Sequence, residues 1–132
     1  EIEASCGRLA AKRIKDADLG ALADANNRCQ EAVNGADYES YYSENEVFHQ
    51  IIYRGAANSF LEKQALRLQK RLKAYRRVQL KFRGRMVQSM SEHSQILNAL
   101  ENGDAEQAAT VLRRHIAVQG EKFHQLIASL ER

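Results

Sequence analysis

The chain has 132 residues, which suits a single domain with a hydrophobic core of its own, so no metal or disulfide is needed merely to hold it together. It contains no Pro, no Trp and only 7 Gly, while residues of high helix propensity dominate, and this composition predicts an all-α fold. The net charge is only +3. No apolar run approaches the roughly 18 residues of a membrane span, which argues against a membrane protein.

Apolar residues at helical spacing predict three helices in the first part of the chain. The first ends at about residue 14. The second starts at Asp16 or Asp18, either of which can serve as its N-cap, and ends at the NGAD sequence of residues 34–37. The third follows Asp37.

Three more helices are expected in the remainder. Asn58 is a suitable N-cap for a long helix that continues to Phe82, and the RGR sequence of residues 83–85 predicts a break or a kink. A fifth helix ends before Gly103, which suits a C-terminal cap, and Asp104 starts the last one. Short connections between long amphipathic helices predict an antiparallel helical bundle of about six helices, with residues 1–132 forming one domain.

Both cysteines, Cys6 and Cys29, lie at apolar helix positions. Two cysteines are too few for a secreted disulfide scaffold, so we expect reduced core residues in a cytoplasmic protein. The first residues already follow a helical pattern and lack an initiator Met, so we expect the chain to be part of a longer protein.

Basic residues are concentrated in one segment, because residues 63–85 carry half of the 20 Lys and Arg side chains and no acidic one. One interpretation is a nucleic-acid surface. We favour the other, the solvated face of a long helix with one or two Arg turned inward towards an anionic ligand. The segment lacks the aromatic pattern of a base-stacking surface and is not followed by a helix-turn-helix pattern.

Three of the four histidines are predicted to face the core. His93 lies on the centre line of its helix's apolar stripe, and His115 lies at the edge of another. His49 follows Asn45 by four residues, so these two share one helical face. His124 lies about 100° from the apolar stripe and is expected at the surface.

Buried imidazoles need polar partners, and an apolar bundle offers few. One shared divalent cation would satisfy three of them at once, and imidazole suits zinc, nickel, copper or iron. Zinc or nickel is our expectation, with Asn45 as the natural oxygen donor. The alternative is that each histidine is structural and has a partner of its own.

Two stretches carry a family resemblance. NEVFHQIIYRGAANSFL (residues 45–61) and SMSEHSQILNALENGDAEQAATVLRRHI (residues 89–116) resemble the FCD domain, the C-terminal effector-binding domain of FadR-type regulators in the GntR family. The resemblance implies a helical bundle that senses a small organic acid, forms a homodimer and acts on operator DNA through an upstream winged helix-turn-helix domain. It implies a transcription regulator, not an enzyme.

The resemblance also implies a metal site. The residues that match the family's ligands are Asn45, His49, His93 and His115. The first departs from the family pattern, which has Asp there. A neutral amide should bind a cation more weakly and leave the site more positive by one unit, which favours an anionic effector as a further ligand.

Polar residues on inward stripes are candidates for effector binding. Gln79 and Gln119 occupy core-facing positions, and the Arg76 fork could bind a carboxylate through two hydrogen bonds. The alternative for Arg76 is that it extends to solvent, as Arg83 would.

Three rival functions fit parts of the pattern. A di-iron enzyme could use the Glu-x-x-His motifs at Glu46–His49 and Glu121–His124, but the second motif lies off the apolar stripe. A hydrolytic zinc enzyme would need a general base, and no inward Glu or Asp is evident from the pattern. A metal-free interaction bundle would use its histidines structurally.

Overall fold

The computed structural model describes residues 1–131, and in that range the chain folds into helices without a strand. The elements are α1 (Ile2–Arg13), α2 (Asp16–Asn34), α3 (Tyr38–Gly55), α4 (Ser59–Arg71), α5 (Lys73–Val78), the 3-10 turn η1 (Gln79–Lys81), α6 (Arg85–Glu101) and α7 (Ala105–Leu130). The all-α antiparallel bundle predicted from composition is confirmed. None of the described helices is long and apolar enough to cross a membrane.

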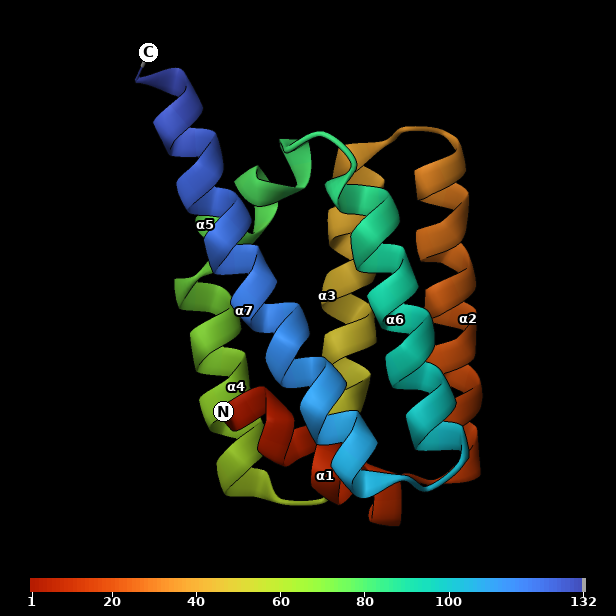
Figure 1. Ribbon diagram of the computed structural model, residues 1–132. Coiled ribbons are helices and arrows are strands. Elements are labelled where there is room, and N and C mark those ends of the chain that lie inside the picture. Colours follow the sequence, from red (N-terminus) through yellow and green to blue (C-terminus); the bar gives the residue numbers. More distant parts are fainter. Residues whose placement is uncertain (132) are drawn as a thin grey trace.

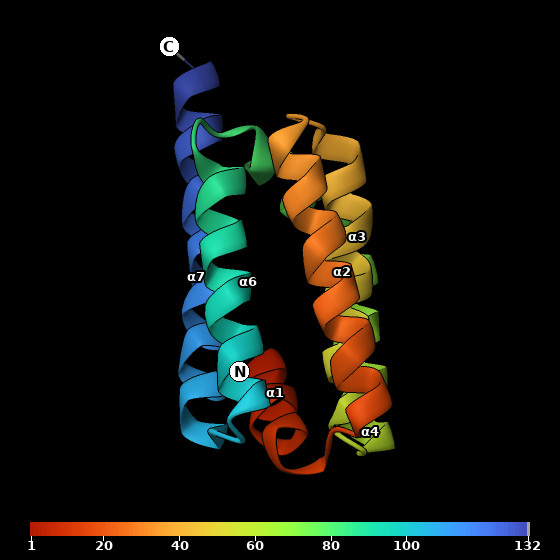
Figure 2. The same cartoon turned by 90° about the vertical axis from the view of Figure 1, so that its right-hand side faces the viewer.

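The long helices run alternately up and down (Figure 1). Turned by 90°, the bundle shows α6 and α7 on one side and α2, α3 and α4 on the other, with the short α1 between them at one end (Figure 2). Helix α1 packs on α7, α3 and α4, while α2 packs on α3 and α6. The three histidines that the sequence predicts to face inward belong to α3, α6 and α7.

Side-chain capping explains the starts of α3, α4 and α7. The side chains of Asp37, Asn58 and Asp104 each accept a hydrogen bond from a backbone N–H in the first turn of the following helix. Gly103 has φ +66° just after α6, as the sequence predicted for a C-terminal glycine. The expected side-chain cap of α2 is wrong, because its N-cap is Lys15 and Asp16 is already the first helical residue. An acid there still interacts favourably with the helix dipole.

The predicted long fourth helix is interrupted. It ends at Arg71, and Leu72 (φ −96°, ψ 7°) separates α4 from α5, so the described chain has seven α-helices where about six were expected. The break changes the packing partner, since α4 lies on α3 and α1 whereas α5 lies on α7. This change of direction places Arg76 and Gln79 inside the bundle. Arg76 is 8% exposed and Gln79 is 2% exposed.

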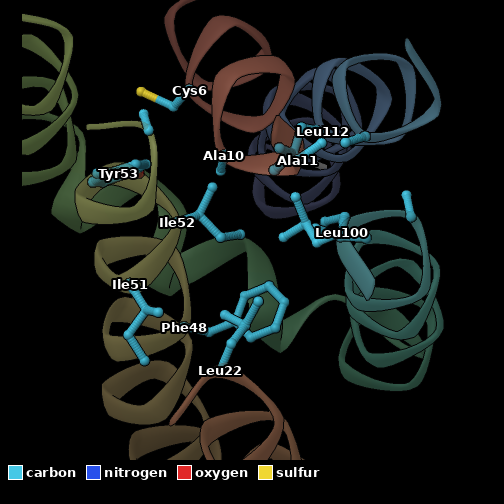
Figure 3. Close-up of a cluster of buried hydrophobic side chains, with 14 of the residues drawn as sticks. Cys6, Ala10, Ala11, Leu22, Phe48, Ile51, Ile52, Tyr53, Leu100 and Leu112 are labelled. Carbon is cyan, nitrogen blue, oxygen red and sulfur yellow. The ribbon is translucent and has the colours of Figure 1, made fainter. Parts of the chain in front are cut away.

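The apolar core has two parts. The larger contains Phe48 and Ile52 of α3 with Leu22, Leu100 and Leu112 of three other helices (Figure 3). The smaller lies towards the other end of α3 and is made by Cys29, Ala32, Tyr41, Tyr42, Leu80, Met86 and Met90. Within the basic segment of residues 63–85, Arg76 and Arg85 are buried and the other basic side chains are exposed, as the solvated-face interpretation predicted.

Candidate metal centre

Three histidines from three helices meet inside the bundle. His49 of α3, His93 of α6 and His115 of α7 are each at most 2% exposed. Their ring centroids are 5.4 Å (His49–His93), 5.0 Å (His93–His115) and 5.2 Å (His49–His115) apart. One nitrogen of each ring lies within 4.8 Å of a nitrogen of the other two. The sequence placed each of these residues on an inward face, and the structure brings them to one point.

The ring of His93 is held by aromatic packing. It stacks on Phe48 at a centroid distance of 4.2 Å, nearly parallel, and on Tyr41 at 5.9 Å. Phe48 belongs to the larger core cluster and Tyr41 to the smaller, so His93 contacts both. Neither ring nitrogen of His93 has a hydrogen-bond partner within residues 1–131.

His49 is oriented by a buried acid of α1. The Glu3 Oε1 atom lies 2.6 Å from Nδ1 of His49. The Glu3 Oε2 atom forms an ion pair of 3.0 Å with the Arg76 guanidinium, but the two groups are not aligned for a hydrogen bond. Burial opposes ionisation of Glu3, but His49 and Arg76 outweigh it and lower the pKa of this carboxyl to about 2. An ionised carboxylate only accepts, so Nδ1 of His49 donates, and in the neutral ring Nε2 carries the lone pair. That Nε2 has no partner in the described chain.

A second acid orients His115 in the same way. Glu92 Oε1 lies 2.7 Å from Nδ1 of His115 and 2.9 Å from Nη1 of the fully buried Arg85. Burial raises the pKa of Glu92, and the Arg85 charge opposes that rise. With Glu92 ionised, Nε2 of His115 carries the lone pair and accepts a hydrogen bond of 3.3 Å from Nε2 of Gln119.

The electrostatics favour neutral rings at His93 and His115. Burial, followed by the proximity of the other histidines and of Arg85, lowers the pKa of both imidazoles well below the usual value. Neutral imidazole is the form that binds metals, and a second ring nitrogen fixed by a carboxylate is the usual arrangement around a metal-bound histidine.

These donors fit a divalent cation. Nε2 of His49 and both ring nitrogens of His93 have no partner among the described residues, whereas Nε2 of His115 would exchange its hydrogen bond from Gln119 for the metal. Oδ1 of Asn45 also has no partner there, and Asn45 is 6% exposed and lies one turn from His49. Small ring movements would bring the nitrogens to the separation of about 3.4 Å that tetrahedral ligation at 2.0–2.1 Å requires. Zinc and nickel both suit this donor set.

The predicted effector residues lie next to this cluster. Arg76 points inward, so the solvent-directed alternative does not hold, whereas Arg83 is exposed. Gln79 connects two arginines, since its Nε2 donates to the Arg76 carbonyl at 2.8 Å and its Oε1 accepts from Nε of Arg85 at 2.6 Å. Gln119 is 5% exposed and contacts His115.

The expectation that no acid faces inward is wrong, because Glu3 and Glu92 both contact the histidine cluster. A signal for Glu3 was available, since Glu3, Cys6 and Ala10 follow the three-and-four spacing of the α1 stripe. Glu92 lies two turns after Arg85 on α6, a separation that ordinary helix-pair rules do not flag.

The di-iron arrangement is not assembled in the described chain. Glu121 and His124 are exposed, and Glu46 lies 3.7 Å from Lys73 in an ion pair at the surface. Glu44 likewise pairs with Arg28 at 2.8 Å, so neither neighbour of Asn45 replaces the missing acid.

Comparisons with known proteins give three results. A family model described as FCD domain matches residues 1–118. A search of curated proteins found no match. Among solved structures, the chain is similar to E. coli McbR/YncC, with a TM-score of 0.75 and 22% identity over 99% of this chain. The chain spans 63% of that protein's length, and at this identity the similarity shows a shared fold.

Proposed function

This chain belongs to the FCD domain family, and from that premise we propose that it senses a small organic acid at a divalent metal ion held by His49, His93, His115 and Asn45. The domain is of the effector-binding type found in GntR-type regulators. The observation that carries the proposal is that three buried imidazoles meet at one point, where His49 and His93 have ring nitrogens without partners in the described range. A bound divalent ion would supply positive charge and open coordination positions there.

The charges around the cluster favour an anionic effector. The two acids that contact the cluster are already offset, the buried Glu3 by Arg76 and the partly buried Glu92 by Arg85. The three imidazoles and the Asn45 amide add no negative charge, so the charge of a bound cation would remain uncompensated in a medium of low dielectric constant. A carboxylate at an open position would neutralise part of it.

Effector binding would act on the arrangement of helices. The four proposed ligands belong to α3, α6 and α7, so a complex that draws them together selects one packing of these helices. In a homodimer with upstream winged helix-turn-helix domains, that packing would set the spacing of the two DNA-binding domains on operator DNA.

The same residues favour a sensor over a hydrolase. A hydrolytic metal site needs a general base directed at the bound water. Glu3 and Glu92 instead contact the Nδ1 atoms of two histidines and are paired with arginines. Their geometry suits orientation of the rings.

The test compares two histidine variants. We expect His93→Ala to lose metal binding by more than the 10–100-fold that removal of an outer partner costs, because a direct ligand is removed. His124→Ala is the matched control, since this ring is exposed. Elemental analysis and zinc titration measure binding, and circular dichroism verifies that each variant is folded. Full metal content in folded His93→Ala would refute the assignment.

A further inference from the structure

A cavity of about 210 Å³ opens between α5 and α7, beside the histidine cluster. Two polar side chains, Arg76 and Gln119, form part of its lining, and they are 8% and 5% exposed. Arg76 pairs with Glu3, which contacts His49, and Gln119 contacts His115 directly. At Gln119 a single side chain therefore lies between this cavity and a proposed metal ligand.

The polar end of the cavity has hydrogen-bonding capacity to spare. Oε1 of Gln119 is buried and has no partner in the part of the chain that the structure describes. A buried amide oxygen without a partner is costly unless a ligand or water satisfies it. That oxygen only accepts hydrogen bonds, so a water or a ligand donor would satisfy it, while the Arg76 guanidinium supplies at this end the positive charge that attracts a carboxylate.

The remaining walls are mostly apolar. Leu72 and Ile116 are aliphatic, and the rings of Tyr75 and Phe123 meet edge to face at a centroid distance of 4.6 Å. Tyr75 is 51% exposed although it is aromatic. An apolar ring placed here would be buried against these walls, which favours a ligand that is polar at one end only.

We propose that the effector is a monocarboxylate with an apolar tail about the size of one aromatic ring. The tail would fill the cavity and pack against the Tyr75 and Phe123 rings, while the carboxylate reaches the histidine cluster past Gln119. An apolar cavity of about 150 Å³ holds a benzene molecule, so 210 Å³ accommodates a ring with a short linker. This inference rests on the proposed function and adds the chemical class of the ligand.

Gly120 offers a way to block the cavity without removing a contact. It lines the cavity, and a Cβ atom built on it meets no other atom within 4 Å. Gly20 of α2 is the matched control, because its Cβ position is equally open and it is not among the residues that line the cavity. Leucine at either position brings the same side chain and the same gain in helix propensity.

The experiment uses isothermal titration of zinc-loaded protein with acetate, 3-phenylpropanoate and 3-phenylpropanol. We expect 3-phenylpropanoate to bind about tenfold or more tightly than acetate, and the alcohol to bind weakly, because the tail adds buried apolar area and the carboxylate supplies the charge. Gly120→Leu should abolish the preference for the phenyl tail, so that the two acids bind with similar affinity. Gly20→Leu should keep the preference.

The outcomes separate the two proposals. If acetate binds in a zinc-dependent way but 3-phenylpropanoate binds no more tightly, or Gly120→Leu keeps the preference, the tail assignment is overturned and the sensor proposal stands. If neither acid binds zinc-loaded protein, the sensor proposal itself fails. If Gly120→Leu changes only the oligomeric state in sedimentation experiments, the cavity is covered by a second copy of the chain and the tail assignment is wrong.

Discussion

Replacing Glu3 by Gln tests the role of the buried acid on α1. The substitution keeps the shape of the side chain and removes its charge. The Arg76 side chain is then left 9% exposed without its counter-charge, and Nδ1 of His49 loses a charged acceptor at 2.6 Å.

The structure sets the expected size of the effect. Removing one partner of a buried ion pair costs about 3–5 kcal/mol, because the other charge stays desolvated. Arg76 borders a cavity that can admit water, so we expect the lower end, about 3 kcal/mol of unfolding free energy. A domain of this kind is stable by about 5–15 kcal/mol, so the variant should remain folded. Zinc affinity should fall by about 10–100-fold, the usual cost of losing the outer partner of a histidine ligand.

Urea denaturation of metal-free protein measures the first effect, and zinc titration against a competing chelator measures the second. Adding Arg76→Met to Glu3→Gln removes the unpaired charge, so the double variant should regain stability relative to Glu3→Gln alone. Zinc affinity should not recover, because the acceptor of His49 is still altered. Glu1→Gln is the surface control, since Glu1 pairs with Arg113 in solvent. A loss below about 1 kcal/mol in Glu3→Gln, with unchanged zinc affinity, would refute the reasoning.

Two further predictions concern Asn45 and the cysteines. Asn45→Asp introduces a charged ligand, so we expect zinc to bind about tenfold more tightly and acetate to bind more weakly. Chelator competition measures zinc binding and calorimetry measures acetate binding. Stronger acetate binding would contradict the charge argument. Cys6 and Cys29 are fully buried, and burial raises the pKa of both thiols to about 12. Iodoacetamide at pH 8 should therefore label them only after unfolding in guanidinium, as mass spectrometry would show, and rapid labelling of native protein would contradict this placement.

Much of the fold could be read from local signals. The starts of α3, α4 and α7 follow from Asp37, Asn58 and Asp104, since capping involves residues only three positions apart. The break at Leu72 could not be read in this way. No glycine or proline marks it, and it follows from the different packing partners of α4 and α5.

The candidate site could likewise be predicted only in part. Helical periodicity by itself determined that His49, His93 and His115 face inward, because a residue's position on a helix depends only on its spacing from its neighbours. Only the tertiary structure decided that the three rings meet, that Glu3 contacts His49 across 46 positions of sequence, and that Arg76 turns in to pair with Glu3. These contacts join different helices, and their geometry depends on how α1, α3, α5, α6 and α7 pack together, which no local pattern specifies.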